Sequence, residues 1–277
     1  MRHAVADLGH TFAANRAVGR IALSVAASAG VTRRLRVGEE GSLRVRCPGA
    51  PSGELEAVIV NTAGGVAGGD RFQIDVDVAP GARLVVTTAA AEKVYRTLEP
   101  DSTIDAKLTV GAGGSLAWLP QETILFDRAR LRRTIDIDLA ENAQLVLAEA
   151  VVFGRSGMGE AADGSSLFDR WRLRRNGALI HAEAVRLDGA VVRKLAESAV
   201  AKGGIAVATV LVVPGDDATT EGVRALGDGF RGEVGVSAWN GFAIVRLCAA
   251  DGAALRHDLV MVLTALRGAS LPRLWLN

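Results

Sequence analysis

A glycine-rich loop constrains the fold of this chain more than any other feature of its sequence. An apolar stretch at 58–60 leads into residues 64–69, where four of the six positions are glycine. A nucleotide-binding loop of this kind leads into a helix whose free N–H groups hold phosphate, and a P-loop has Lys after its last glycine. Here Asp70 follows, and residues 72–78 alternate polar and apolar side chains with the period typical of a strand. The glycines are therefore expected to allow positive φ or close approach of the chain between two strands.

A strand, a tight turn and a second strand recur between residues 70 and 190. The turns fall at Gly81, Gly113, Asn142 and Gly177, so successive turns are 32, 29 and 35 residues apart. Self-similarity near this period is typical of layered β architectures. The paired strands are expected at 72–78 and 84–88, 103–110 and 116–119, 134–139 and 145–150, and 171–174 and 179–184. We predict a mainly β fold of stacked β-hairpins that share one core, in a single domain over residues 1–277.

Two helices are predicted near the C-terminus. The first is a short helix at 219–226, and the second is an amphipathic helix at 253–266 with Asp251 as N-cap and Gly268 as stop. The apolar stripe of the second helix consists of Leu255, Leu259, Val262, Leu263 and Leu266. This stripe must be buried, either on the chain's own sheet or on a partner. Residues 189–203 fit a helix or a loop.

The composition excludes several classes of function. A formal net charge of +1 leaves no surplus of Lys and Arg for a nucleic acid backbone, so no nucleic-acid partner is expected. No apolar run approaches the roughly 20 residues of a membrane span, and polar residues 1–17, expected to be flexible, lack the apolar core of a signal peptide. Cys47 and Cys248 are too few for a disulfide framework. These features predict a cytoplasmic protein with no membrane partner.

The four histidines and two cysteines give little support for catalysis or for a tight metal site. None of the histidines lies beside a nucleophile motif, so hydrolase chemistry is weakly supported. Neither His nor Cys occurs in pairs with the spacing of metal ligands. We therefore expect no catalytic residues, no tightly bound cofactor and no tight metal site.

Carboxylates within apolar or glycine-rich segments are the candidate functional groups instead. They are Asp70 after the glycine loop, Glu122 within 118–127, Glu149 at the end of an apolar strand, and Glu160 at the end of 153–160. Burying such groups is costly unless they are paired or hydrated. Two arrangements remain open: internal ion pairs with Arg71, Arg128 or Arg155, or a hydrated channel lined with acids.

Five segments together resemble the UreD family of urease accessory proteins, also called UreH. They are GGVAGGDR at 64–71, TTAAAEKVYR at 87–96, WLPQETILFD at 118–127, GRSGMGE at 154–160 and LPRLW at 271–275. The similarity covers about residues 35–277. It implies a mostly β, helically wound fold with two helices. It also implies a maturation factor without enzymatic activity that binds apo-urease, recruits UreF and through it UreG, and passes nickel through an internal tunnel.

This resemblance assigns possible roles to the acids. The candidate nickel-path residues are Asp70, Glu122, Asp127, Glu149, Glu160 and, on a strand that also carries His181, Glu183. Carboxylates with water bind Ni²⁺ less tightly than imidazole or thiolate does, so isolated acids suit transient Ni²⁺ better than storage.

The C-terminal segment 250–277 is the candidate docking region. Its candidate partner-binding residues are Leu255, Leu259, Val262, Leu266, Arg273 and Trp275, with Trp275 as an aromatic anchor of the kind interfaces favour. The alternative function, from another class, is a β-sandwich hydrolase or carbohydrate-binding protein. Such an enzyme would turn over a substrate alone, whereas a scaffold would be inert alone and would co-purify with its partners.

Overall fold

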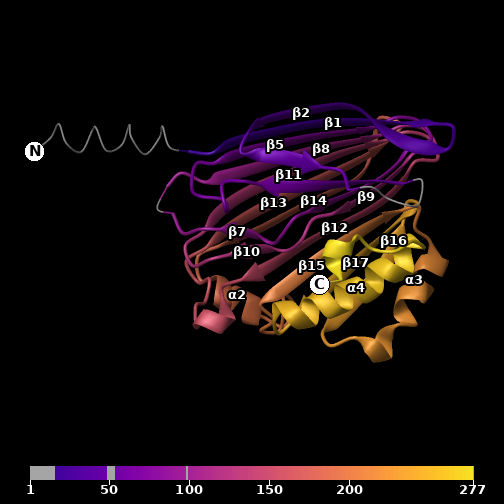
Figure 1. Cartoon of the computed structure of the whole chain (residues 1–277). Helices are drawn as coiled ribbons and strands as arrows, with labels where there is room; N and C mark the ends of the chain where they lie inside the picture. The colour runs from indigo at the N-terminus through magenta and orange to yellow at the C-terminus, as the bar shows by residue number, and fades with distance from the viewer. Residues whose placement is uncertain (1–15, 49–53, 98, 277) are drawn as a thin grey trace, which may run out of the picture.

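The alternating segments of the sequence form two facing β-sheets, and the C-terminal helix covers the outer side of one of them (Figure 1). The computed structural model describes residues 16–48, 54–97 and 99–276, so most of the predicted flexible segment 1–17 lies outside the described residues. Sheet A has the strand order β14 (Ala178–Asp188), β13 (Ser166–Arg175), β11 (Arg130–Leu139), β8 (Ser102–Val110), β5 (Arg71–Val78), β1 (Val18–Ser28) and β2 (Val31–Gly41).

Sheet B faces sheet A across the main core. Its strand order is β16 (Glu233–Trp239), β17 (Phe242–Ala249), β15 (Ala206–Val213), β12 (Gln144–Phe153), β9 (Ser115–Leu119), β6 (Arg83–Thr88), β4 (Leu55–Asn61) and β3 (Leu43–Arg46). Two short strands extend it, β7 (Glu92–Val94) paired with β10 (Thr123–Leu125), which also pairs with β12.

Between β5 and β12 the chain winds in successive coils, each with one strand in either sheet. β5 leads through a tight turn into β6, β8 into β9, and β11 into β12, and equivalent strands of successive coils pair in parallel. The turn residues Gly81, Gly113 and Asn142 have φ of 69°, 61° and 55°, as the predicted turns require. The mainly β, helically wound architecture is confirmed.

The pairing within the coils differs from the predicted hairpins. The two strands of each of the first three predicted units lie in different sheets, and of the four units only β13 and β14 form an antiparallel hairpin. Alternation specifies which face of a strand is buried and leaves the pairing partner open. Both arrangements bury the same side chains, so the sequence pattern does not distinguish them.

Three α-helices and three short 3₁₀ segments complete the fold. They are α2 (Val191–Ala196), α3 (Asp217–Arg224), α4 (Gly252–Arg267), η1 (Ser156–Met158), η2 (Gly227–Gly229) and η3 (Arg273–Trp275). The Asp251 side chain accepts a hydrogen bond from Ala254 N at 2.8 Å, and Gly268 ends α4 with φ of 60°. Both predicted ends of this helix are confirmed. The undecided stretch 189–203 contains the six-residue α2.

The apolar stripe of α4 packs on the outer face of sheet B and forms a second core (Figure 1). Leu255, Leu259 and Val262 are at most 2% exposed, and Trp275 is also buried. The prediction that these four side chains dock a partner is therefore corrected. The outer face of sheet B carries apolar residues such as Val85 and Ala148, and α4 and the C-terminal tail cover them.

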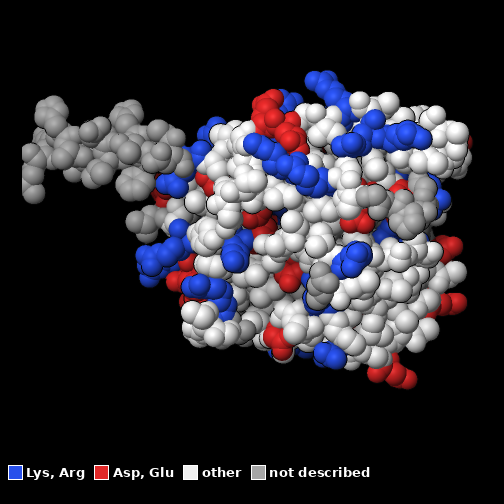
Figure 2. Space-filling model, viewed as in Figure 1, with Lys and Arg blue, Asp and Glu red and all other residues white. Residues whose placement is uncertain are grey.

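The remaining two docking candidates are more accessible. Arg273 is exposed and Leu266 is half-buried. Basic and acidic side chains are interspersed over the visible face of the molecule (Figure 2), in keeping with the net charge of +1. Among the described residues, none of the helices has the length and apolarity needed to span a bilayer.

Candidate functional site

A cavity of about 70 Å³ lies between the two sheets, and we call it the inter-sheet cavity. Its walls are mostly apolar, with Phe72 and Ile74 of β5 opposite Val86 of β6. Three charged residues also line it, namely Glu92 of β7, Arg133 of β11 and Glu149 of β12. The volume exceeds the roughly 10–15 Å³ that one water molecule needs, and the polar groups give water partners. The cavity therefore has room for a small hydrated ligand or ion.

Glu149 belongs to a buried charge cluster at one side of this cavity. Arg133, 4% exposed, pairs with Glu149 and with Asp169, whose Oδ1 accepts from Nε at 3.1 Å. The Trp118 indole donates to Glu149 Oε1 at 2.8 Å. Burial raises the pKa of Glu149, although Arg133 opposes the shift. Burial lowers the pKa of Arg133, but the two carboxylates outweigh it and raise that pKa overall. Two carboxylates and one guanidinium leave this cluster with a negative formal charge.

Glu92 lies at another side of the cavity and has an uncharged partner. The Asn61 amide Nδ2 is 3.2 Å from each oxygen of the Glu92 carboxylate. Within the described parts of the chain, no Lys, Arg or His lies within salt-bridge distance of it. Burial raises the pKa of Glu92 to about 7, while the Asn61 hydrogen bond opposes the shift and Asp70 adds to it. Of the two carboxylates that line the cavity, Glu149 pairs with a guanidinium, whereas Glu92 has only a neutral amide as partner.

The sequence reasoning missed Glu92. It lies within the segment 87–96 that contributed to the family resemblance, as a single acid after three alanines. Asn61 is the last residue of β4, immediately before the glycine loop. The available signal for Glu92 was a single acid that follows three small residues, together with an Asn at the end of a predicted strand.

A second hollow of about 280 Å³, the outer pocket, adjoins the inter-sheet cavity. It is lined by the glycine loop, including Gly64 and Gly65, and by residues 88–93. The Tyr95 hydroxyl donates to Gly64 O at 2.8 Å. Gly65 has φ of 144°, and a Cβ there would lie 2.4 Å from the Tyr95 ring. The predicted role of the glycines, positive φ and close chain approach, holds at this position, and it shapes the wall of the outer pocket.

The carboxylate of Asp70 stabilises the glycine loop. It is 3% exposed and accepts hydrogen bonds from Ala17 N at 2.8 Å and Ala67 N at 2.7 Å. One oxygen therefore satisfies a backbone donor within the glycine loop, and the other satisfies a donor just before β1. Asp70 lies outside the residues that line the inter-sheet cavity and the outer pocket.

The other four predicted acids are not among the residues that line the inter-sheet cavity, and each lies within salt-bridge distance of an arginine. Glu122 Oε2 is 3.1 Å from Arg256 of α4, an arginine that the sequence reasoning did not select. Glu183 accepts two hydrogen bonds from Arg246 and lies 3.4 Å from His181.

Asp127 and Glu160 lie close together in two loops, Asp127 just after β10 and Glu160 just after η1. Asp127 accepts from Gly164 N at 3.0 Å and lies 3.5 Å from Arg128, while Glu160 accepts from Asp127 N at 2.8 Å and pairs with Arg155. The structure thus brings Glu149 together with Glu92, and it does not bring the six predicted acids into one channel. Of the two arrangements left open, ion pairs with the predicted arginines account for Asp127 and Glu160, although Arg128 is 59% exposed and its pair lies at the surface. Across the described residues, no group of three or more His, Cys, Asp and Glu side chains is placed to hold a metal ion.

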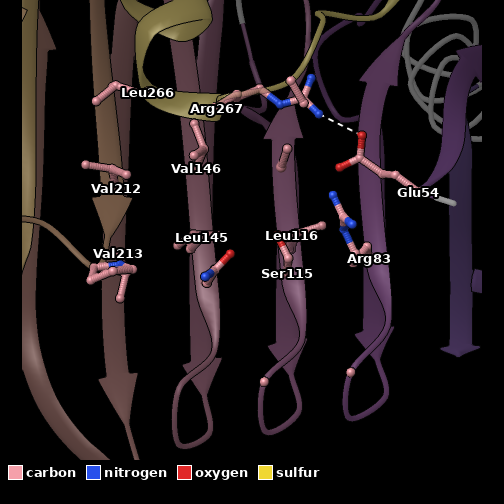
Figure 3. Close-up of a pocket in the computed structure, with 16 residues that line it drawn as sticks. Glu54, Arg83, Ser115, Leu116, Leu145, Val146, Val212, Val213, Leu266 and Arg267 are labelled. Atoms are coloured by element: carbon pink, nitrogen blue, oxygen red, sulfur yellow. Dashed lines mark hydrogen bonds and ion pairs between the residues drawn. The ribbon is translucent and has the colours of Figure 1, made fainter. Parts of the chain in front are cut away.

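A larger hollow of about 500 Å³ lies on the outer face of sheet B (Figure 3). It crosses β6, β9, β12 and β15 and is bordered by the end of α4. Arg267 NH2 bonds to Glu54 Oε2 at 2.8 Å, and Arg83 is exposed beside them. Two guanidinium groups against one carboxylate give this groove a net positive charge, so it does not suit a cation.

The fold and the cavity together define a coiled two-sheet β scaffold with an internal, negatively charged cavity. Comparison with known proteins gives its family: the model of the UreD urease accessory protein family matches residues 17–276. The chain belongs to the UreD family.

Individual members of that family are similar over nearly the full length. The urease accessory protein UreD of Rhodopseudomonas palustris is 58% identical over 267 residues, which cover 96% of each chain. UreD of Bradyrhizobium diazoefficiens is 56% identical over 277 residues, 100% of each chain. UreD 1 of a Bradyrhizobium species is 52% identical over 274 residues, covering 99% of this chain and 98% of the relative.

Proposed function

We propose that this protein is a scaffold in urease maturation, with a nickel path that uses the inter-sheet cavity. In this proposal it binds apo-urease and UreF, contacts UreG through UreF, and gives Ni²⁺ a route toward the urease active site in the cytoplasm. Family membership supports the role in urease maturation. The single observation that supports a path is a cavity between the sheets with Glu92 and Glu149 on its walls.

The chemistry of the cavity suits a cation in transit. Carboxylate oxygens and water bind Ni²⁺ less strongly than imidazole or thiolate ligands do, so the metal can leave again. Glu149 is already engaged by Trp118 and Arg133, which limits how tightly it can hold a metal. Nickel is cargo here, and the chain itself performs no catalysis.

The size of the cavity argues against the alternative function. A hydrolase or carbohydrate-binding site typically occupies about 300–1,000 Å³, several times the volume between these sheets. The larger outer groove has that volume, but its lining contains no His, Cys or nucleophile–base pair.

Narrowing the cavity tests the proposal. Ile74→Phe places a larger side chain in the cavity wall, and Ile135→Phe makes the same change in the same core outside the lining residues. Each variant replaces the wild-type chain in cells that express urease and its accessory proteins at limiting nickel. Nickel per urease subunit and co-purification with UreF and urease subunits are measured.

We expect Ile74→Phe to co-purify normally but to lower the nickel content of urease, and Ile135→Phe to leave nickel content near wild type. Overpacking a well-packed core costs about 1–3 kcal/mol, so Ile135→Phe sets an upper bound on the loss of stability expected for Ile74→Phe, which borders free volume. Normal nickel content with Ile74→Phe would contradict the path. Absence of UreF and urease subunits from wild-type preparations would contradict the scaffold.

A further inference from the structure

The inter-sheet cavity and the outer pocket share three wall residues, Ile59, Thr88 and Glu92. Two of the three are fixed by the sheet. Ile59 of β4 pairs directly with Thr88 of β6, and the Thr88 hydroxyl accepts from Gln121 N at 2.8 Å and donates to Ala90 O at 2.9 Å. We call these three shared residues the partition. Glu92 is its charged member, and its side chain can rotate without disturbing the strand pairing of β4 and β6.

Asn61 holds the Glu92 carboxylate from the glycine-loop side. Its Oδ1 accepts from Ala63 N at 3.0 Å, and its Nδ2 donates to Gly65 O at 3.0 Å as well as to Glu92. The Nδ2–carboxylate distances of 3.2 Å are at the long end for hydrogen bonds, and one amide serves three acceptors. Asn61 is therefore anchored to the loop, while its contact with Glu92 is weak enough for another ligand to replace.

The charges at the partition and inside the inter-sheet cavity favour a cation. A ligand in the outer pocket meets Glu92 at the partition, and Glu149 lies on the wall of the inter-sheet cavity. Arg133 is the cation in the cavity lining, and Glu149 and Asp169 neutralise it. Asp70 adds further negative potential near Glu92. Lys93 is the basic residue in the lining of the outer pocket, and it is exposed. The negative charge on this route therefore lies at Glu92 and within the inter-sheet cavity.

We propose that Asn61 and Glu92 form a doorway between the outer pocket and the inter-sheet cavity, through which a divalent cation passes. The Glu92 carboxylate exchanges its Asn61 hydrogen bonds for contact with the cation and turns about its side-chain bonds, and Asn61 receives it again after passage. The glycine loop sets the width of the doorway because it fixes Asn61. This inference rests on the proposed nickel path.

The test uses charge-removing and charge-keeping variants in the complete accessory complex at limiting nickel. Glu92→Gln keeps the size of the side chain and removes its charge, Glu92→Asp keeps the charge, and Glu141→Gln is a matched control at an exposed turn remote from the cavity. We expect Glu92→Gln to lower nickel per urease subunit by at least about tenfold, the low end of what a focusing charge gives to association rates. Glu92→Asp restores part of the loss, and Glu141→Gln matches wild type. Wild-type nickel content with Glu92→Gln overturns the doorway.

A second variant decides the matter if Glu92→Gln fails to co-purify. Asn61→Asp is nearly isosteric and places a second carboxylate at the doorway, so Ni²⁺ should be retained in the purified accessory complex while urease receives less. Wild-type nickel retention by the accessory complex together with wild-type nickel delivery to urease overturns the doorway.

Comparison with Ile74→Phe separates this inference from the proposed function. If Ile74→Phe lowers nickel content and the doorway variants do not, the path stands without the doorway, whereas no effect from any of them rejects both.

Discussion

Two glutamates of the same cavity differ in what compensates their charge. Glu149 is bound by a buried guanidinium and an indole N–H, and removal of one member of such a buried pair typically costs about 3–5 kcal/mol. Glu92 has only the amide of Asn61 among the described residues. The first carboxylate is therefore part of the framework of the core, while the second retains the capacity to bind a ligand.

The Glu92 carboxyl should make stability fall as pH rises. Its pKa is raised from 4.5 to about 7 in the folded chain, so between these values the folded state holds a proton that the unfolded state has lost. The folded state then binds more protons, and the free energy of unfolding decreases with rising pH, by about 1–3 kcal/mol after allowance for partial exposure. Glu92→Gln should lack this decrease. Urea unfolding of both chains at several pH values between 4 and 8 measures the difference, and parallel profiles would contradict the assignment.

Sequence reasoning identified Glu149 as a candidate site residue but not Glu92, and the difference has a physical reason. Glu149 interrupts an apolar strand, and a carboxylate in such a strand is conspicuous because its burial is costly. Glu92 follows three alanines, and its burial results from the packing of β4, β7 and the glycine loop around it. Its partner Asn61 is 31 residues away in the sequence, so the contact becomes apparent only in the folded chain, where the winding places the two residues side by side.

At the scale of elements, α4 and the C-terminal tail act together as a cover for sheet B. Arg256 of α4 bonds to Gln121 Oε1 at 2.6 Å and to the carbonyls of Leu274 and Trp275 at 3.1 Å. The Trp275 indole donates to Leu119 O at 3.1 Å. Local signals predicted the ends of α4, because an N-cap and a C-terminal glycine act within one turn. They did not predict the surface on which its apolar stripe packs, since an amphipathic helix fits its own sheet or a partner equally well.

Trp275→Ala should therefore destabilise the chain itself. The indole is 2% exposed, and replacement of a buried Trp by Ala costs about 3–5 kcal/mol. Leu276→Ala, at a side chain that is 66% exposed, is the matched control and should change stability by less than about 0.5 kcal/mol. Urea midpoints of the isolated or complexed chain give both values. Equal midpoints for the two variants would restore Trp275 as a candidate for partner docking.

At the scale of the whole molecule, the two sheets are linked by a polar clamp at the edge where β14 and β17 meet. Arg246 of β17 bonds to Glu183 of β14 at 2.5 and 2.7 Å and to Thr209 Oγ1 at 3.1 Å. Burial alone would raise the pKa of Glu183, but the two hydrogen bonds from Arg246 and the nearby His181 ring outweigh it and lower the pKa to about 2. The stabilisation from this carboxylate is present above its unfolded pKa and is lost as pH falls toward 2.

Arg246→Ala should loosen this edge selectively. Arg246 is 49% exposed, so the global cost is modest, about 1–2 kcal/mol for the carboxylate left with fewer partners. Amide hydrogen exchange in β14 and β17 should accelerate, while exchange in β5 and β8 stays unchanged. Arg186→Ala removes a surface pair within β14 and serves as the control. Uniform acceleration across both sheets would show that the clamp is not local.

Because the chain winds in repeated coils, evolution can change its length by whole coils. β6, β9 and β12 come from successive coils, so each coil adds one rung to sheet B, and neighbouring rungs lie about 4.8 Å apart. Genetic duplication or loss of one coil would lengthen or shorten the molecule by one rung and leave the other rungs in register. Lineages that vary in coil number would therefore vary the length of the interior in discrete steps.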